Sequence, residues 1–262
     1  MRTTTELNTE NLETNPIYGT KHLGKYHYNH ANTSKIIETI QDKFGLEVIS
    51  TSIVKPRKKE KLGYQKHLVT MSADFLKIDD QNKVTLIIEN SHDCKSSLKF
   101  RLGIYRLVCA NGLITGKTFL SKRIIHTTPN FYNEIETSIN QLLNQTTKLK
   151  DLIKKGLNKD ITKYQIKELM NKAIKQRYNL KDNEFQVDYR SYPFLREEDK
   201  NLNVYDQFNR IQEAVIRGGG KYLLFNKETE KWELKTIRRL KSIDKQVDLN
   251  QKLFNEFELL VA

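Results

Sequence analysis

The period of the hydrophobic residues changes once along this chain, and that change limits its fold more than any other feature. In the first half, apolar and polar residues alternate, most clearly over 69–75 and 98–105, and a period of two predicts half-buried strands. After residue 127 the apolar residues recur at steps of three and four, as in amphipathic helices. This order predicts an α+β protein with an antiparallel sheet of four to five strands over about residues 46–120.

Turn and cap residues place the expected elements. A short amino-terminal helix is capped by Ser34 and ended by Gly45, and Asn111-Gly112 is a strong turn signal between two strands. Gly218-Gly219-Gly220 ends a later helix with a flexible exit. The expected strands cover residues 46–54, 69–75, 84–88, 98–109 and 113–120, and the expected helices cover 34–44, 128–149, 162–178, 202–216 and 244–257.

The length of 262 residues suits one large domain. We expect a flexible amino-terminal arm (1–33) and a single α+β domain (34–262), with a sheet part (34–126) and a helical part (127–262). Cys94 and Cys109 are too few for a disulfide framework, so we expect a reducing, cytoplasmic environment. The first residues do not resemble a secretory signal, and no apolar run approaches the ~18 residues of a membrane span.

The charge is basic and unevenly distributed. Lys and Arg total 45 against 32 Asp and Glu, a net charge of +13. Two stretches hold the whole surplus, because residues 46–126 and 148–181 each carry eight more basic than acidic groups. Such concentration is typical of a surface that binds a polyanion.

The first basic stretch contains the linker between the first two expected strands. Its candidate nucleic-acid-binding residues are Lys55, Arg57, Lys58, Lys59, Lys61, Tyr64 and Lys66. A basic loop can follow a phosphate backbone without recognising bases. The alternative is a solvated, lysine-rich loop that protects the edge of a sheet.

The polar face of the fourth strand presents Lys99, Arg101 and Tyr105. Cations with an aromatic ring on one sheet face suit a single strand of nucleic acid, since bases stack on the ring; the alternative is an ordinary solvated face. The basic helix 162–178 is better explained as the outer face of an amphipathic helix.

The run from Asn90 to Cys94 suggests a second type of chemistry. His92 and Asp93 could serve metal-dependent hydrolysis, and His92, Cys94, Cys109 and His126 are all zinc-type ligands. Their spacing fits no compact zinc pattern, and a polar turn with Asp93 bonded to nearby amides explains the run better.

The remaining signals for metals and cofactors are weak. His22, His27 and His30 could hold a metal or form a packing arm with the tyrosines among them. Gly218 to Lys221 lacks the spacing of a phosphate-binding loop. We therefore expect no catalytic residues, no metal and no cofactor.

Three ordered runs carry a family resemblance. They are Asn90-Ser91-His92-Asp93 with Tyr105 to Leu113, then Asn203 to Arg210 with Ile216-Arg217-Gly218-Gly219, and then Arg238 to Asn250. Together they resemble the domain of unknown function 932 family (DUF932), the phage/plasmid-like proteins. The resemblance implies a mobile-element origin, a role near DNA metabolism and the cytosol of a bacterial host. In outline, the expected fold also resembles Rad52-type single-strand annealing proteins.

These observations lead to one main hypothesis and two alternatives. The main hypothesis is a non-catalytic nucleic-acid-binding protein that binds or anneals single-stranded DNA in recombination or replication, as a homo-oligomer and without a membrane partner. The first alternative is a metal-dependent nuclease or hydrolase that uses His92 and Asp93. The second is an interaction protein that inhibits a host factor.

Overall fold

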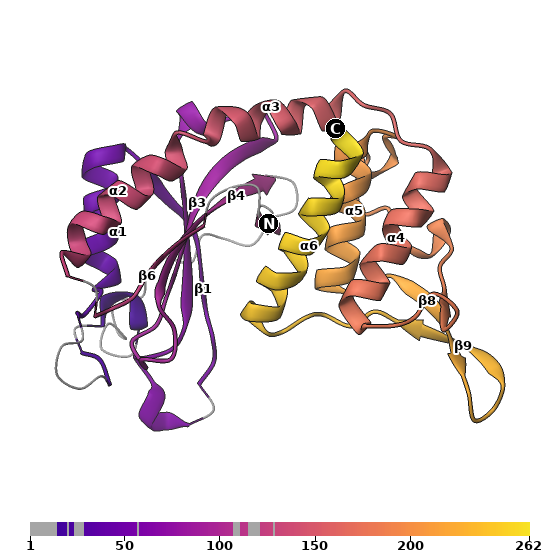
Figure 1. Ribbon diagram of the computed structural model, residues 1–262, viewed down its shortest axis with the longest axis horizontal. Coiled ribbons are helices and arrows are strands. Elements are labelled where there is room, and N and C mark those ends of the chain that lie inside the picture. Colours follow the sequence, from indigo (N-terminus) through magenta and orange to yellow (C-terminus); the bar gives the residue numbers. More distant parts are fainter. Residues whose placement is uncertain are drawn as a thin grey trace. The chain divides into compact units, whose positions relative to one another are not determined.

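The computed structural model describes residues 15–19, 21–23, 29–56, 58–106, 111–114, 121–127 and 129–262 (Figure 1). The chain forms two compact units. The first contains residues 1–105 and 120–146, and the second contains 106–119 and 147–262. The border thus falls about twenty residues later than the expected division at 126/127, because the first long helix after the sheet packs against a sheet strand.

The first unit is built on an antiparallel sheet, drawn in purple and magenta in Figure 1. Its strands are β1 (Glu47–Ile53), β2 (His67–Ser72), β3 (Asn82–Asn90), β4 (Leu98–Arg106) and β6 (Ser121–Ile124). They follow the order β1-β2-β3-β4, and β6 pairs with β4. The pairs β1–β2, β2–β3 and β4–β6 are antiparallel. The predicted α+β fold with an antiparallel sheet in the first half is therefore confirmed.

Two helices complete the first unit, α1 (Thr33–Phe44) and α2 (Phe131–Leu143), and both lie on the same side of the sheet in Figure 1. Gly45 ends α1 in the left-handed conformation as predicted, with a φ of 63°. The predicted cap Ser34 is wrong, because the Asn32 side chain accepts the hydrogen bond from the Lys35 amide at 3.2 Å.

The side chains of β4 alternate between the two faces of the sheet. Its apolar residues are almost fully buried, and they are Leu98, Phe100, Leu102 and Ile104. Lys99, Arg101 and Tyr105 alternate with them and therefore share the opposite face. The hydrophobic alternation thus assigned the core face correctly.

The second unit combines helices with a small sheet. Its helices are α3 (Thr146–Leu157), α4 (Lys163–Tyr178), α5 (Val204–Arg217) and α6 (Ile243–Val261). Its strands are β5 (Asn111–Ile114), β7 (Phe185–Gln186), β8 (Lys221–Asn226) and β9 (Lys231–Thr236). Helices α4, α5 and α6 contact one another, β5 contacts α6, and the three later strands form the sheet β7-β8-β9. Aromatic rings of α5 and α6 fill the core, with Phe208 and Phe257 centred 5.0 Å apart.

Two expectations for this half are corrected. The expected helix 128–149 is two helices, because a turn at Asn144 and Gln145 interrupts it. The expected flexible exit after the three glycines is instead the hairpin β8–β9. Gly218 has a φ of 92°, and a Cβ there would lie 2.6 Å from the carbonyl oxygen of Ile237, so glycine is required where the helix meets the hairpin.

In the part of the chain that the structure describes, no helix combines the length and apolar character needed to cross a membrane.

Candidate nucleic-acid interface

Two connections meet at one end of the first unit's sheet. They are the β1–β2 loop (residues 54–66) and the β3–β4 turn (residues 91–97). His67 pairs with Asn90, so the end of the loop lies beside the start of the turn. The backbone amide of His92 donates a hydrogen bond of 3.2 Å to the carbonyl oxygen of Tyr64. This bond holds two segments together that are distant in sequence.

A buried carboxylate, Glu89 at the end of β3, gathers three cations at this site. Its Oε1 lies 2.9 Å from Lys99 Nζ and 3.4 Å from Lys66 Nζ. Its Oε2 lies 2.5 Å from Arg101 Nη1. The Glu89 side chain is 1% exposed, while the cations retain 24%, 21% and 11% in that order. One negative charge thus anchors three positive charges near the surface.

The pKa of Glu89 shows how strongly these cations act on it. Burial by itself would raise this pKa, but hydrogen bonds from Lys99 and Arg101 and their positive charges outweigh the burial. The pKa of Glu89 falls to about 2, so the carboxylate stays ionised at neutral pH.

Two further lysines lie where the loop touches the turn. Lys61 is the last residue of a short 3-10 helix (Lys59–Lys61) in the loop, and the side chain of Lys95 in the turn acts on its ammonium group. This interaction and the charge of Lys95 lower the pKa of Lys61. We call Lys61, Lys66, Lys95, Lys99 and Arg101 the basic cluster.

The structure places the other predicted binding residues around or away from this cluster. Lys55, Lys58 and Lys59 are exposed on the same loop, and Lys58 lies 3.6 Å from Glu60. Tyr64 is half-buried, and Arg57 lies outside the described residues.

Tyr105 shares the sheet face of Lys99 and Arg101 but lies toward the far end of β4. It lies four positions beyond Arg101 along the strand, which corresponds to about 13 Å. The Nζ of Lys83 lies 6.0 Å from the centre of its ring. Tyr105 therefore does not touch the basic cluster.

Sequence reasoning missed two members of this site, Glu89 and Lys95. A usable signal existed for Lys95, because the first and third connections of an antiparallel meander lie at the same end of the sheet. Glu89 precedes Asn90 in a strand, and its only sequence signal was a charge at the end of an apolar run. Neither signal identifies which cations a carboxylate contacts.

The structure gives His92 and Asp93 separate environments. Asp93 Oδ1 accepts hydrogen bonds from the Lys95 amide at 3.1 Å and from Ser91 Oγ at 3.0 Å, which confirms the prediction of a polar turn. The His92 ring is fully buried, and its Nε2 donates to the carbonyl oxygen of Pro16 at 2.7 Å. In this arrangement His92 cannot reach a substrate.

His92 belongs to a buried group of histidine rings. Its ring centroid lies 4.6 Å from that of His30 and 5.5 Å from that of His67. Burial lowers the pKa of His92 to about 3, with help from the charges of neighbouring histidines, and lowers that of His67 to about 4. These rings are therefore neutral at physiological pH.

Hydrogen bonds fix the position of the His67 ring. Asn90 donates to Thr33 Oγ1 at 2.9 Å, Thr33 donates to His67 Nε2 at 2.8 Å, and His67 Nδ1 donates to the carbonyl oxygen of Gln65 at 2.9 Å. The group is thus a structural element that joins the start of α1 to β2 and β3.

The described residues contain no set of side chains arranged to bind zinc, as the zinc hypotheses would require. Within the described ranges, no three or more His, Cys, Asp or Glu side chains are placed to hold a metal ion. Cys94 is exposed and forms no disulfide within the described residues. Cys109 and His27 lie outside the residues that the structure describes.

In the second unit, the basic block 148–181 divides into two parts. On α4, Lys172 Nζ lies 2.9 Å from Glu256, and Lys175 Nζ lies 2.8 Å from Asp182. The apolar face of α4 is buried as predicted, through Ile166, Leu169, Met170, Ala173 and Ile174. Carboxylates thus compensate much of the charge of this helix.

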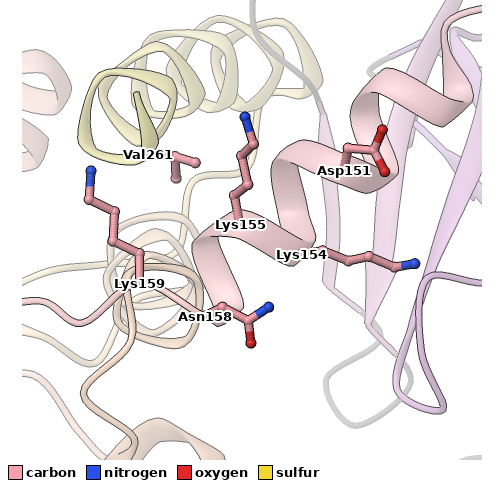
Figure 2. Close-up of a pocket in the computed structure, with 6 residues that line it drawn as sticks. All are labelled: Asp151, Lys154, Lys155, Asn158, Lys159 and Val261. Atoms are coloured by element: carbon pink, nitrogen blue, oxygen red, sulfur yellow. The ribbon is translucent and has the colours of Figure 1, made fainter.

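The other part of the block lines an open pocket of about 730 Å³ at the end of α3. Its walls are Asp151, Lys154, Lys155, Asn158, Lys159 and Val261. In Figure 2, Lys155 and Lys159 extend on either side of Val261, while Lys154 points away from both. Lys154 and Lys155 lie in the last helical turn, where cations stabilise the negative end of the helix dipole, so helix stability accounts for them.

The fold and the site define a two-unit α+β protein with a basic cluster at one end of its first sheet. A family model described as a domain of unknown function (DUF932) matches residues 25–254, and the chain belongs to this family. The predicted resemblance is therefore confirmed, and the matched range includes all three signature runs.

Two relatives come from Escherichia coli strain K12, and both are UPF0380 proteins. YfjQ is 24% identical over 240 residues, and YafZ is 23% identical over 237 residues. Each alignment covers 90% of this chain and 83% of the relative. No solved structure matches the chain, so the outline resemblance to Rad52-type proteins has no support from known folds.

Proposed function

We propose that this protein binds nucleic acid, single-stranded DNA foremost, through the β1–β2 loop and the basic cluster, without catalysing a reaction on it. The observation that carries the proposal is the convergence at Glu89. Lys66 from the loop and Lys99 and Arg101 from β4 contact one carboxylate, so two basic segments that are separate in sequence form one surface.

The charge of this surface supports a polyanionic ligand. Five cations of the cluster face two carboxylates, Glu89 and Asp93, and Asp93 already accepts two hydrogen bonds within its turn. The exposed Lys55, Lys58 and Lys59 add charge on the adjoining loop. A positive surface with exposed lysine groups binds phosphates by releasing counterions, independently of base sequence.

The members of the surface differ in what they can contribute. Lys66 and Lys99 are partly exposed and can bind a phosphate while remaining near Glu89. Arg101 is the most buried cation, so its main contribution is to hold Glu89 in place and to raise the local positive potential. Tyr64 and Tyr105 are half-buried aromatic rings on which a base can stack.

Fluorescence anisotropy with a labelled single strand at rising salt tests the proposal. We expect binding at low salt, and we expect the triple variant Lys55→Gln, Lys58→Gln and Lys59→Gln to bind more weakly. Its slope of log affinity against log salt should fall by about 2, at ~0.7 for each lost phosphate contact with a single strand.

A matched control removes three exposed lysines of the second unit, Lys231→Gln, Lys241→Gln and Lys245→Gln. This control has the same net charge as the test variant and should bind like the wild type. An equal loss of affinity in the two variants would show that the effect depends only on net charge. Absence of wild-type binding at low salt would overturn the proposal.

A further inference from the structure

The strand β9 forms an open edge of the small sheet in the second unit. The order of this sheet is β7-β8-β9, and within the described residues no other strand pairs with the outer side of β9. In Figure 1 the β8–β9 hairpin extends away from the helices of its own unit. An uncovered edge presents unpaired backbone groups, so it can accept a further strand.

The backbone groups at this edge belong to Trp232, Leu234 and Thr236. The amide of Ile237, one residue after β9, donates to the carbonyl oxygen of Gly220 at 2.7 Å, on the side of β8. Backbone groups alternate in direction along a strand, so those of Thr236, Leu234 and Trp232 point away from β8. Three residues of β9 therefore offer amide and carbonyl groups to a partner strand.

The side chains at the same positions are apolar and exposed. Trp232 is 41% exposed and Leu234 is 62% exposed. They share one face of the hairpin with Phe225 and Leu223, their partners in β8, and the rings of Phe225 and Trp232 are centred 5.2 Å apart. Edge strands are commonly protected by a proline or a bulge, and residues 231–236 contain neither. The edge is therefore open to pairing.

The charges of β9 are complementary to those of a second copy of the same strand. In an antiparallel pair centred on Leu234, Glu233 of each copy lies opposite Lys235 of the other, and Trp232 lies opposite Thr236. Within one chain, Lys235 Nζ already lies 2.6 Å from Glu233 Oε2, so the pair would join four alternating charges. This register also brings the outward backbone groups of the two strands together. A register centred on Glu233 would instead oppose like charges.

We propose that β9 is the dimerisation edge of this protein and that its partner is β9 of a second copy, in an antiparallel pair with a two-fold axis at Leu234. The dimer joins two small sheets into one sheet of six strands. Each copy contributes the same surface, as a two-fold interface requires. Strand addition at an exposed sheet edge is a recurring mode of recognition. The contact is short, so the dimer is reversible and forms as the concentration rises.

Sedimentation velocity of nuclease-treated protein over a range of concentrations tests this edge. The wild type should move from the monomer mass toward twice that mass, and the emission of Trp232 should shift to shorter wavelength in parallel, because pairing covers this single tryptophan. Leu234→Lys should stay monomeric, because it places two ammonium groups against each other at the two-fold axis. Leu259→Lys makes the same change at a 71% exposed position of α6, and this control should dimerise like the wild type.

A pair of charge variants tests the register. Lys235→Glu gives β9 two carboxylates at these positions, and Glu233→Lys gives it two ammonium groups. Each variant alone should dimerise less than the wild type, because like charges face each other across the axis. An equimolar mixture should recover the dimer as a heterodimer with opposite charges in register. Mixing does not change the fold of either chain, so the recovery reports the interface itself.

Three results would overturn the dimerisation edge. They are a wild type that stays monomeric at every accessible concentration, a Leu234→Lys variant that dimerises as well as the wild type, and an equal loss of the dimer in Leu234→Lys and Leu259→Lys. A mixture of the charge variants that recovers no dimer would overturn the register centred on Leu234.

Discussion

Arg106 and Asp206 are 100 residues apart in the chain, and Arg106 Nη2 lies 2.9 Å from Asp206 Oδ1 in the interior of the second unit. Both side chains are at most 6% exposed. The other carboxylate oxygen of Asp206 accepts hydrogen bonds from Asn201 and Asn203, at 2.9 and 2.8 Å. This pair joins the first signature run of the family to the second.

Asp206→Ala should strongly destabilise the second unit. The substitution leaves the buried Arg106 guanidinium without its nearest counterion, and removing one partner of a buried pair costs about 3–5 kcal/mol. Trp232 is the single tryptophan of the chain and lies in β9 of this unit, so its fluorescence during urea unfolding reports the change. Glu197→Ala, which breaks an exposed pair with Lys200, should cost less than about 1 kcal/mol. Similar losses in both variants would contradict this.

Glu89→Gln should destabilise the first unit by roughly 3 kcal/mol. This is the low end of the range for one lost partner of a buried pair, because Lys66 and Lys99 retain contact with water. The change is measured by circular dichroism during thermal unfolding. Glu60→Gln removes a carboxylate from an exposed pair with Lys58 and should leave the Tm within error. If Glu89→Gln also leaves the Tm unchanged, Glu89 is not the anchor of the basic cluster.

Acid should destabilise the first unit between about pH 6.5 and pH 4. The pKa of His67 is about 4 and that of His92 about 3 in the folded state, whereas an unfolded histidine titrates near 6.5. Below pH 6.5 the unfolded chain therefore binds more protons, and each such histidine removes about 1.4 kcal/mol of stability per pH unit. This stability is fully present above pH 6.5 and is lost as the pH falls toward the folded pKa values.

Denaturation of His92→Gln at several pH values checks this prediction. A glutamine amide can still donate to Pro16, but it does not titrate, so the variant should lose less stability between pH 7 and pH 5 than the wild type. Identical slopes in the two proteins would show that His92 does not contribute to the acid sensitivity.

Gly218→Ala and Gly45→Ala should differ in their cost although both glycines have a positive φ. At Gly45 a Cβ meets nothing within 4 Å, so only the backbone cost of about 1–2 kcal/mol applies. At Gly218 a Cβ also lies 2.6 Å from the Ile237 carbonyl oxygen and 2.9 Å from the Arg239 amide, so the chain must shift. Urea unfolding should therefore show the larger loss for Gly218→Ala, and the reverse order would refute the assigned clash.

Local patterns predicted most elements of the fold. The alternation in β4 identified a strand and its buried face, and helical spacing identified the core faces of α1, α4 and α6. The alternation over 69–75 identified β2 only as far as Ser72, because Phe75 is exposed in a 3-10 helix (Asp74–Leu76). Several local features were misjudged, including the Ser34 cap and the Asn111-Gly112 turn, which the structure places at the start of β5. The hairpin β8–β9 follows three glycines that suggested flexibility, and the helix break at Asn144 has no glycine or proline to mark it.

The binding residues were predicted as two separate sets, one in a loop and one on a strand. Lys66, Lys99 and Arg101 belong to these sets, but their common partner Glu89 and the nearby Lys95 do not. A net charge counted by segment shows where cations are abundant, but it does not show which of them a carboxylate neutralises.

The sequence by itself determined the α+β class, the buried face of β4 and the two segments that hold the positive charge, because these depend on local periodicity and composition. Only the tertiary structure decided that three cations share Glu89 and that Arg106 meets Asp206. These contacts depend on strand register and on packing between distant segments. A shift of one residue along a strand turns every side chain to the other face, and no local pattern specifies that alignment across the chain.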